Sequence, residues 1–148
     1  MADLHDIETR DDCELLVRTF YGQAMTDHLI GYLFTDIAKL DLTTHIPRIT
    51  DFWETILLGG GNYRGGAFRV HYDLHRQSPL QTGHFDRWLV LWRASVDACF
   101  QGPRAELAKA HALRVARAFS SRLETLDAAE QQPQAGGFLV VQHGPAPH

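Results

Sequence analysis

The chain has 148 residues, of which 45% are hydrophobic and 22% are charged, and its formal net charge is −4. This length suits one domain with one core, and the mild negative charge, without a stripe of basic and aromatic residues, excludes a typical nucleic-acid-binding surface. No apolar run is long enough for a membrane span and the acidic N-terminus lacks the apolar stretch of a secretory signal, so we expect a cytoplasmic protein.

The first predicted helix begins at Thr9, because Asp12 follows three residues later, as in a capping box. Apolar residues then recur at helical spacing as far as Met25. A second, short helical stretch is expected over residues 29–34, where Gly31 weakens the pattern.

Another helix is expected to start around Asp41, and the glycines of residues 59–62 end it. Pro47 should fall in its first turn, where the missing N–H does least harm. Residues three or four positions apart share one face of a helix. That face carries His45, Ile49, Phe52, Trp53 and Ile56.

The segment 63–81 has the least regular pattern, with a short helical stretch expected from Phe68 to Leu74 and a break at Ser78-Pro79. Thr82 then starts the clearest helix in the chain, because a wide apolar stripe follows it. The stripe consists of Phe85, Trp88, Leu89, Trp92, Val96, Cys99 and Phe100.

Gly102-Pro103 ends that helix and begins the last one, so the two helices should pack antiparallel. The apolar face of the last helix carries Ala108, Ala112, Val115, Phe119, Leu123 and Leu126. The composition becomes linker-like after residue 127. We therefore predict an all-α domain over residues 1–127 and a loose tail over 128–148, with a short apolar patch at 138–141.

Four residues in these apolar helical stretches can carry chemistry together: Tyr21, His45, His71 and Trp88. If they converge on one cavity, they can hold a flat iron cofactor and a small diatomic ligand. A neutral imidazole is a good axial ligand for haem iron, which makes His71 the candidate, although it is one of nine histidines. Apolar walls for such a cofactor are available from Phe34, Phe52, Trp53, Phe68, Leu74, Leu89 and Trp92.

The polar residues of this group each have a plainer interpretation as well. Tyr21 is either a core tyrosine bonded to a carbonyl or a donor to a ligand, a charge-assisted bond that contributes on the order of 1.5–3 kcal/mol. His45 is either an exposed first-turn histidine or a gate and second polar contact. Trp88 packs first and can also donate through its indole N–H. Arg48 and Arg69 are candidates to pair with haem propionates.

Zinc is a weaker alternative. His71 and His75 have the i, i+4 spacing that places two imidazoles on one helix face, but the glutamate of the H-E-x-x-H pattern is absent. His75, next to an arginine, is more simply a solvated loop residue. Cys13 and Cys99 have no CxxC spacing and predict two reduced thiols rather than a zinc ribbon or a disulfide framework.

Over about residues 7–126 the chain resembles the truncated haemoglobins of group III. The resemblance rests on an ordered set: residues 20–21, 30–34, His45 with 51–53, 63–65 before His71, and 85–89. It implies a two-over-two helical globin with haem b, His71 as the proximal ligand, and Tyr21, His45 and Trp88 on the distal side. It also implies Ile49 as the apolar distal residue and Phe34 as the phenylalanine that packs on the porphyrin.

Two departures from the family pattern stand out. The tryptophan often found three residues before the distal-helix histidine is Leu42 here. The stretch after His71 is longer than expected, which leaves His71, His75 and His84 all open as the iron ligand. His71 keeps the expected spacing from residues 63–65, and we retain it as the prediction.

The leading functional hypothesis is a haem protein that binds O2, NO, CO or a related diatomic ligand. Three polar groups on the distal side favour tight holding of the ligand, which suits nitric oxide detoxification or peroxide-dependent oxidation with an unidentified reductase. One alternative is a haem-based sensor or partner-binding module that docks through residues 138–141. Another is a cofactor-free helical interaction domain with Tyr21, Trp53 and Trp88 as core residues. The oligomeric state is not predicted.

Overall fold

The structure, a computed structural model, describes residues 3–61 and 63–131, and within these ranges it is helical and contains no strand. Its elements in order are α1 (Arg10–Ala24), the π-helix η1 (Leu33–Ile37), α2 (Leu42–Leu58), α3 (Ala67–Gln77), α4 (Thr82–Cys99) and α5 (Pro103–Gln131). The all-α prediction is confirmed. None of the described helices is both long and apolar enough to cross a membrane.

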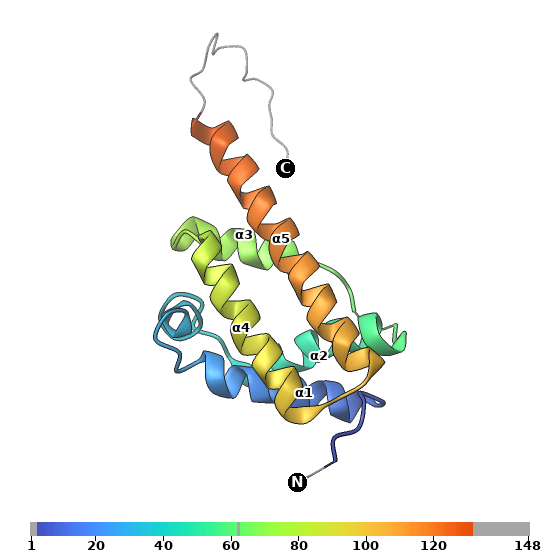
Figure 1. Cartoon of the computed structure of the whole chain (residues 1–148). Helices are drawn as coiled ribbons and strands as arrows, with labels where there is room; N and C mark the ends of the chain where they lie inside the picture. Colours follow the sequence, from blue (N-terminus) through green and yellow to red (C-terminus); the bar gives the residue numbers. More distant parts are fainter. Residues whose placement is uncertain (1–2, 62, 132–148) are drawn as a thin grey trace.

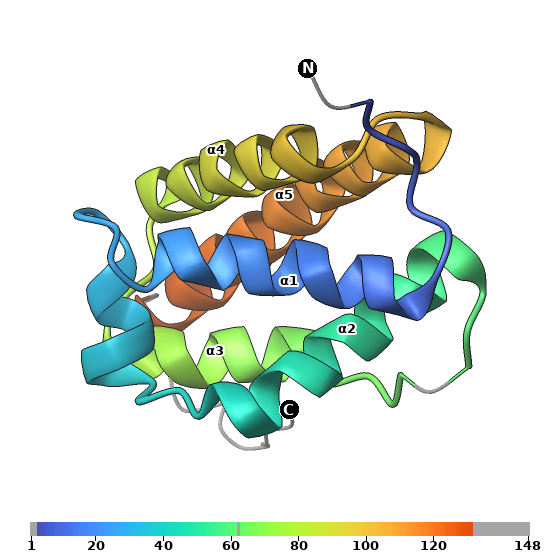
Figure 2. The ribbon, with the colours of Figure 1, turned by 90° about the horizontal axis from the view of Figure 1, so that it is seen from below.

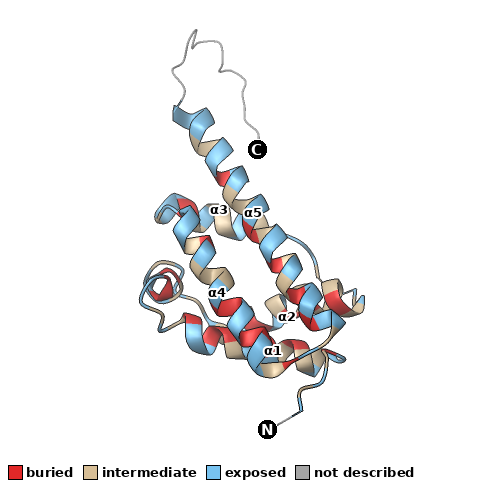
Figure 3. Cartoon of the chain, viewed as in Figure 1, coloured by how far each residue is buried: buried red, intermediate tan, exposed pale blue. Residues whose placement is uncertain are grey.

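Two pairs of helices build the body of the molecule (Figures 1 and 2). α4 and α5 pack against each other in antiparallel directions, and α1 contacts both α2 and α4. α3 contacts α5 and η1. Buried residues follow the inward faces of the helices, while the far end of α5 is mostly exposed (Figure 3).

The helix ends follow local signals in the sequence. Thr9 Oγ1 accepts a hydrogen bond from the Asp12 backbone N–H (3.2 Å), and the Asp12 carboxylate accepts from the Thr9 N–H (3.1 Å), so the predicted capping box is present. Gly59 ends α2 with a φ of 80°, a left-handed conformation that favours glycine. Pro47 lies in the second turn of α2, which begins at Leu42, rather than in the first turn as predicted.

Gly31 allows a close approach between two parts of the backbone. A Cβ at this position would lie 2.8 Å from the carbonyl oxygen of Met25, so the chain after α1 can fold back only around a glycine. Asp27 accepts backbone N–H bonds from Leu29 and Ile30 in the same turn. The predicted short helix over 29–34 is displaced toward the π-helix at residues 33–37.

Two helices are longer than predicted. α3 spans Ala67–Gln77, where a stretch of 68–74 was expected. α5 continues to Gln131, so the first four residues assigned to the tail are helical. The apolar patch at 138–141 and the rest of the tail lie outside the described residues, and the domain boundary at 127 stays a prediction.

The segment before α1 is fixed to the start of α5. The Asp6 carboxylate accepts the backbone N–H groups of Arg104 (2.9 Å) and Ala105 (2.8 Å), and thereby caps a helix that begins almost a hundred residues later. Gly102, at φ 144°, lies against Asp6, where a Cβ would come within 2.6 Å of the carboxyl carbon. Ile7 is fully buried beside this contact.

Candidate functional site

Tyr21 on α1 and His45 on α2 form a direct side-chain pair. The Tyr21 hydroxyl and His45 Nε2 lie 2.7 Å apart and share a hydrogen bond. Burial raises the pKa of Tyr21 and lowers the pKa of His45, and the nearby His71 and Arg48 lower the pKa of His45 further. Both groups of the pair are therefore neutral at pH 7.

Aromatic rings enclose this pair on the α1 side. The Tyr21 ring packs edge-on against Phe34 (5.6 Å between centroids) and Phe20 (5.1 Å). Trp88 from α4 packs on the same Phe20 at 5.9 Å. The structure thus brings Tyr21, His45 and Phe34 together. Phe20 lies between Tyr21 and Trp88. Ile49, one turn after His45, is half-buried.

His71 lies on α3 with one ring nitrogen fixed and the other open. Its Nδ1 is 2.8 Å from the carbonyl oxygen of Ala67, which can only accept, so the proton is on Nδ1 and Nε2 carries the lone pair. Within residues 3–61 and 63–131, Nε2 has no hydrogen-bond partner. Burial lowers the pKa of His71, which keeps this nitrogen available to a metal at neutral pH.

The other two candidate ligands use both of their ring nitrogens. His75 accepts the Leu80 backbone N–H at Nδ1 (2.8 Å) and contacts the Asp127 carboxylate through Nε2 (2.9 Å). His84 accepts the Gln81 N–H at Nδ1 and pairs with the Tyr32 hydroxyl through Nε2. Of the three histidines, His71 alone has a nitrogen left for a cofactor or metal.

His75 is also where the sequence interpretation is wrong. It is 8% exposed and belongs to α3, whereas a solvated loop residue was expected. Its engaged nitrogens also remove the support for a zinc site with His71. A group of three possible metal ligands in the described part of the chain is His5, Glu8 and Asp12 near the N-terminus, and Asp12 there already caps α1.

The surroundings of His71 are apolar and aromatic. Phe119 of α5 lies 5.0 Å from the His71 ring and 5.3 Å from Phe68, centroid to centroid. Leu74, one turn further along α3, is half-buried. Phe119 was absent from the predicted pocket, although the apolar face of the last helix already contained it.

Three tryptophans stack behind the site. Trp92 lies 4.5 Å from Trp53 and 5.9 Å from Trp88, centroid to centroid, with nearly parallel planes. Trp53 and Trp92 are 3% and 1% exposed, so protein covers them on all sides and they support Trp88 from the core. Phe52 is half-buried and packs against Tyr63 and His111.

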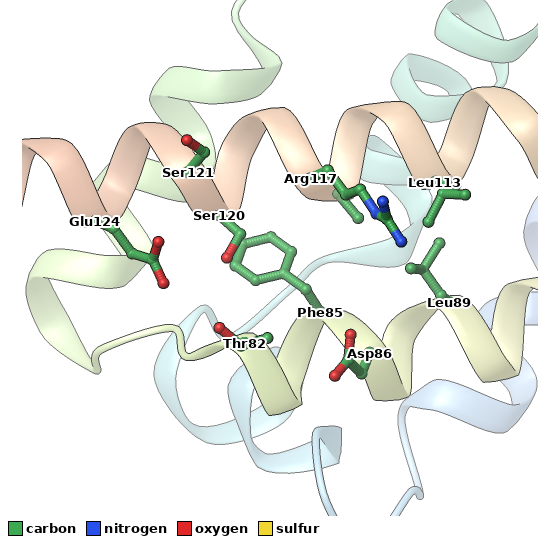
Figure 4. A pocket seen from close by; sticks show the side chains of 10 residues that line it. Thr82, Phe85, Asp86, Leu89, Leu113, Arg117, Ser120, Ser121 and Glu124 are labelled. Atoms are coloured by element: carbon green, nitrogen blue, oxygen red, sulfur yellow. The ribbon is translucent and has the colours of Figure 1, made fainter.

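Of the remaining predicted residues, two arginines are exposed and Leu89 is half-buried. Arg48 is exposed and has no ion pair in the described part of the chain, and Arg69 is exposed and pairs with Asp73 (2.9 Å) on its own helix. Leu89 lines a separate groove of about 320 Å³ between α4 and α5, beside Phe85 and Arg117 (Figure 4). An exposed guanidinium can pair with the solvent-facing carboxylates of a cofactor, so the assignment of Arg48 and Arg69 to propionates stays a prediction.

The donor set fits an apolar planar cofactor that takes one imidazole ligand. One nitrogen of His71 is open and unprotonated. His71 also lies near the Tyr21–His45 pair, since its protonated form would lower the pKa of His45. Several large apolar side chains that pack on the core keep part of their surface uncovered: Phe34, Ile49, Phe52, Phe68, Leu74 and Trp88. A partly covered apolar surface next to an open ligand is what such a cofactor needs.

Comparison with known proteins points in the same direction. The chain is 26% identical to a group 3 truncated haemoglobin of Campylobacter jejuni over 111 residues, which cover 73% of this chain and 85% of that protein. The crystal structure of a group III truncated haemoglobin from Campylobacter jejuni matches with a TM-score of 0.72 at 24% identity, covering 82% of this chain and 95% of that one. No family model matches the chain. The resemblance and the truncated-globin fold predicted from sequence are confirmed.

Proposed function

We propose that this chain, with its truncated-globin fold, binds haem b through His71 and holds a diatomic gas, O2, NO or CO, beside Tyr21 and His45. A ferrous haem, when bound, supplies an iron coordination position for such a gas. The observation that carries the proposal is the difference between the histidines: His75 and His84 use both ring nitrogens, and His71 uses one.

On the distal side, the protein itself contributes the hydrogen bond between the Tyr21 hydroxyl and His45, whose proton can lie on either residue. Because the Tyr21–His45 pair is neutral, its single hydrogen bond can run in either direction. When His45 Nε2–H donates to the Tyr21 oxygen, the phenol proton is free to donate to a polarised ligand. Such a bond contributes on the order of 1.5–3 kcal/mol to holding the ligand.

Tight holding favours chemistry on the ligand over transport. We therefore extend the proposal to nitric oxide detoxification or peroxide-dependent oxidation, supported by an external reductase. Location in the cytoplasm belongs to the same proposal. The sensor alternative depends on residues 138–141, which lie outside the described residues.

The proposal is tested by the haem content of a His71→Ala variant. We expect purified wild type to carry haem with a strong Soret band. The variant should lose stoichiometric haem, because His75 and His84, the other two candidate ligands, use both of their ring nitrogens. Added imidazole should restore part of the band by occupying the vacated space. His84→Ala is the matched control and should keep its haem.

Retention of haem by the variant would contradict the assignment of His71. Full haem retention by His71→Ala, with an unchanged five-coordinate ferrous spectrum, would show that another residue binds the iron. A colourless wild type that does not take up added haem would instead support the cofactor-free helical domain.

A further inference from the structure

The side chain of His75 connects α3 to α5. It is 8% exposed, and its Nε2 lies 2.9 and 3.0 Å from the two carboxylate oxygens of Asp127, whose side chain is 43% exposed. The Leu80 backbone N–H donates to Nδ1, so the ring proton is on Nε2 and points at the carboxylate. Both the tautomer and the orientation of this imidazole are thereby determined.

His75 lies one turn after His71, on the same face of the same helix. The i→i−4 backbone hydrogen bonds of α3 link the two positions, so a displacement at residue 75 would also shift residue 71. His75 holds the C-terminal end of α3 in two directions, toward α5 through Asp127 and toward the following turn through Leu80.

The other contacts between α3 and α5 restrain the orientation of α3 less. Phe68 and His71 pack on Phe119, and the Arg122 guanidinium lies 4.1 Å from the centre of the Phe68 ring. These ring contacts do not fix the orientation of a polar group on α3. Arg76 and Glu130 form an ion pair of 2.7 Å between the same two helices, but both side chains are more than half exposed. Exposed ion pairs are screened by water and hold little.

We propose that His75 and Asp127 are positioning residues, which set the orientation of α3 and thereby aim His71 Nε2 at the iron. This inference rests on the proposed function, because it concerns the residue proposed as the ligand. It also gives a reason for the length of α5, whose last turns carry Asp127, the final residue of the predicted domain, to His75.

The test compares Asp127→Ala with Glu130→Ala, which removes the exposed ion pair between the same helices. Resonance Raman spectra of the ferrous haem-bound proteins measure the iron–histidine stretching band. We expect this band to broaden and shift to lower frequency in Asp127→Ala and to stay unchanged in Glu130→Ala. Haem transfer to an acceptor protein should be about tenfold faster in Asp127→Ala. Asp127→Asn, which keeps an acceptor oxygen, should restore most of the wild-type band.

A second measurement needs no haem. In the haem-free protein, nitrogen-15 NMR should show His75 protonated at Nε2, and Asp127→Ala should change the ring nitrogen shifts of both His75 and His71. Glu130→Ala should change neither. If Asp127→Ala proves too unstable for these measurements, His75→Gln is measured in the same two ways, with the same expectations for the band and for the His71 shifts.

The outcomes separate the two proposals. An unchanged iron–histidine band and unchanged His71 shifts in Asp127→Ala would overturn the positioning role and leave haem binding intact. Equal shifts in Asp127→Ala and Glu130→Ala would also overturn it, because the effect would then belong to the helix contact in general. A wild type without haem would overturn the proposed function, not the His75–Asp127 contact.

Discussion

At the scale of single residues, the proposed chemistry depends on which ring nitrogens are already in use. A histidine with both nitrogens bonded to the protein is a structural element, and one with an open nitrogen can be a ligand. His71 and His75 show this contrast within one helix. Sequence alone cannot make the distinction, because the bonding partner of His75 lies 52 positions away at Asp127.

Tyr21→Phe tests the other polar side chain of the site. The substitution keeps the ring packed against Phe34 and removes the hydroxyl that pairs with His45. We expect the O2 dissociation rate of the haem-bound protein to rise about tenfold or more, the kinetic equivalent of the 1.5–3 kcal/mol such a bond supplies. Stopped-flow displacement of O2 by CO measures the rate.

The control for this prediction is Tyr32→Phe, which removes an exposed hydroxyl bonded to His84. It should leave the O2 dissociation rate at the wild-type value. A wild-type rate in Tyr21→Phe would remove Tyr21 from the contacts that hold the ligand.

At the scale of elements, the sequence predicts well wherever the signal is local. The capping box at Thr9 and the glycine end of α2 both act within a few residues, and both are present. The π-helix at 33–37 was not predicted, because its position depends on the return of the chain across Met25, a contact that helical spacing does not encode. Likewise, α3 is longer than its apolar pattern because His75, a polar residue, is buried in it.

Two glycine substitutions, expected to change the stability of the fold in opposite directions, test the assignment of the helix ends. Gly22→Ala, in an exposed helical position of α1, should stabilise the fold by about 0.5–1 kcal/mol. Gly59→Ala should destabilise it by about 1–2 kcal/mol, because its φ of 80° is left-handed. Neither new Cβ would touch another atom within 4 Å, so backbone conformation alone decides the sign. Urea unfolding measures both, and shifts of the same sign would refute the assignment.

At the scale of the whole molecule, the two-over-two arrangement could be predicted from the resemblance, and the antiparallel pairing of the last two helices from their short connection. The attachment of residue 6 to the start of α5 could not, since no local pattern connects a carboxylate to backbone N–H groups so far along the chain. The same limit applies to the stack of Trp53, Trp92 and Trp88, which joins α2 to α4.

The Asp6→Asn variant tests the attachment of residue 6 to the start of α5 through the pH dependence of stability. Although burial opposes it, the backbone N–H groups of Arg104 and Ala105 lower the pKa of Asp6 below its ordinary value of 3.8. A lowered carboxyl pKa stabilises the fold above pH 3.8, and this stabilisation is lost as the pH falls through the folded-state pKa. We expect the variant to be about 0.3–1 kcal/mol less stable than wild type at pH 7, because Asn keeps a capping oxygen and loses the negative charge at the start of α5.

Urea unfolding at several pH values should show this difference narrowing as the pH falls below 3.8. Asp3→Asn, which changes an exposed carboxylate on the same segment, should show no difference at any pH. A constant gap between wild type and Asp6→Asn from pH 7 to the acid limb would show that ionisation of Asp6 is not what holds the segment.

The bond between Asp6 and Ala105 spans 99 positions, and this has a consequence for how the protein is made. A ribosome delivers residue 6 first, and at cellular elongation rates its partner follows about 5–20 s later. During that interval the nascent chain lacks the backbone N–H groups that bind this carboxylate. Attachment of the N-terminal segment therefore waits until the start of α5 has left the exit tunnel.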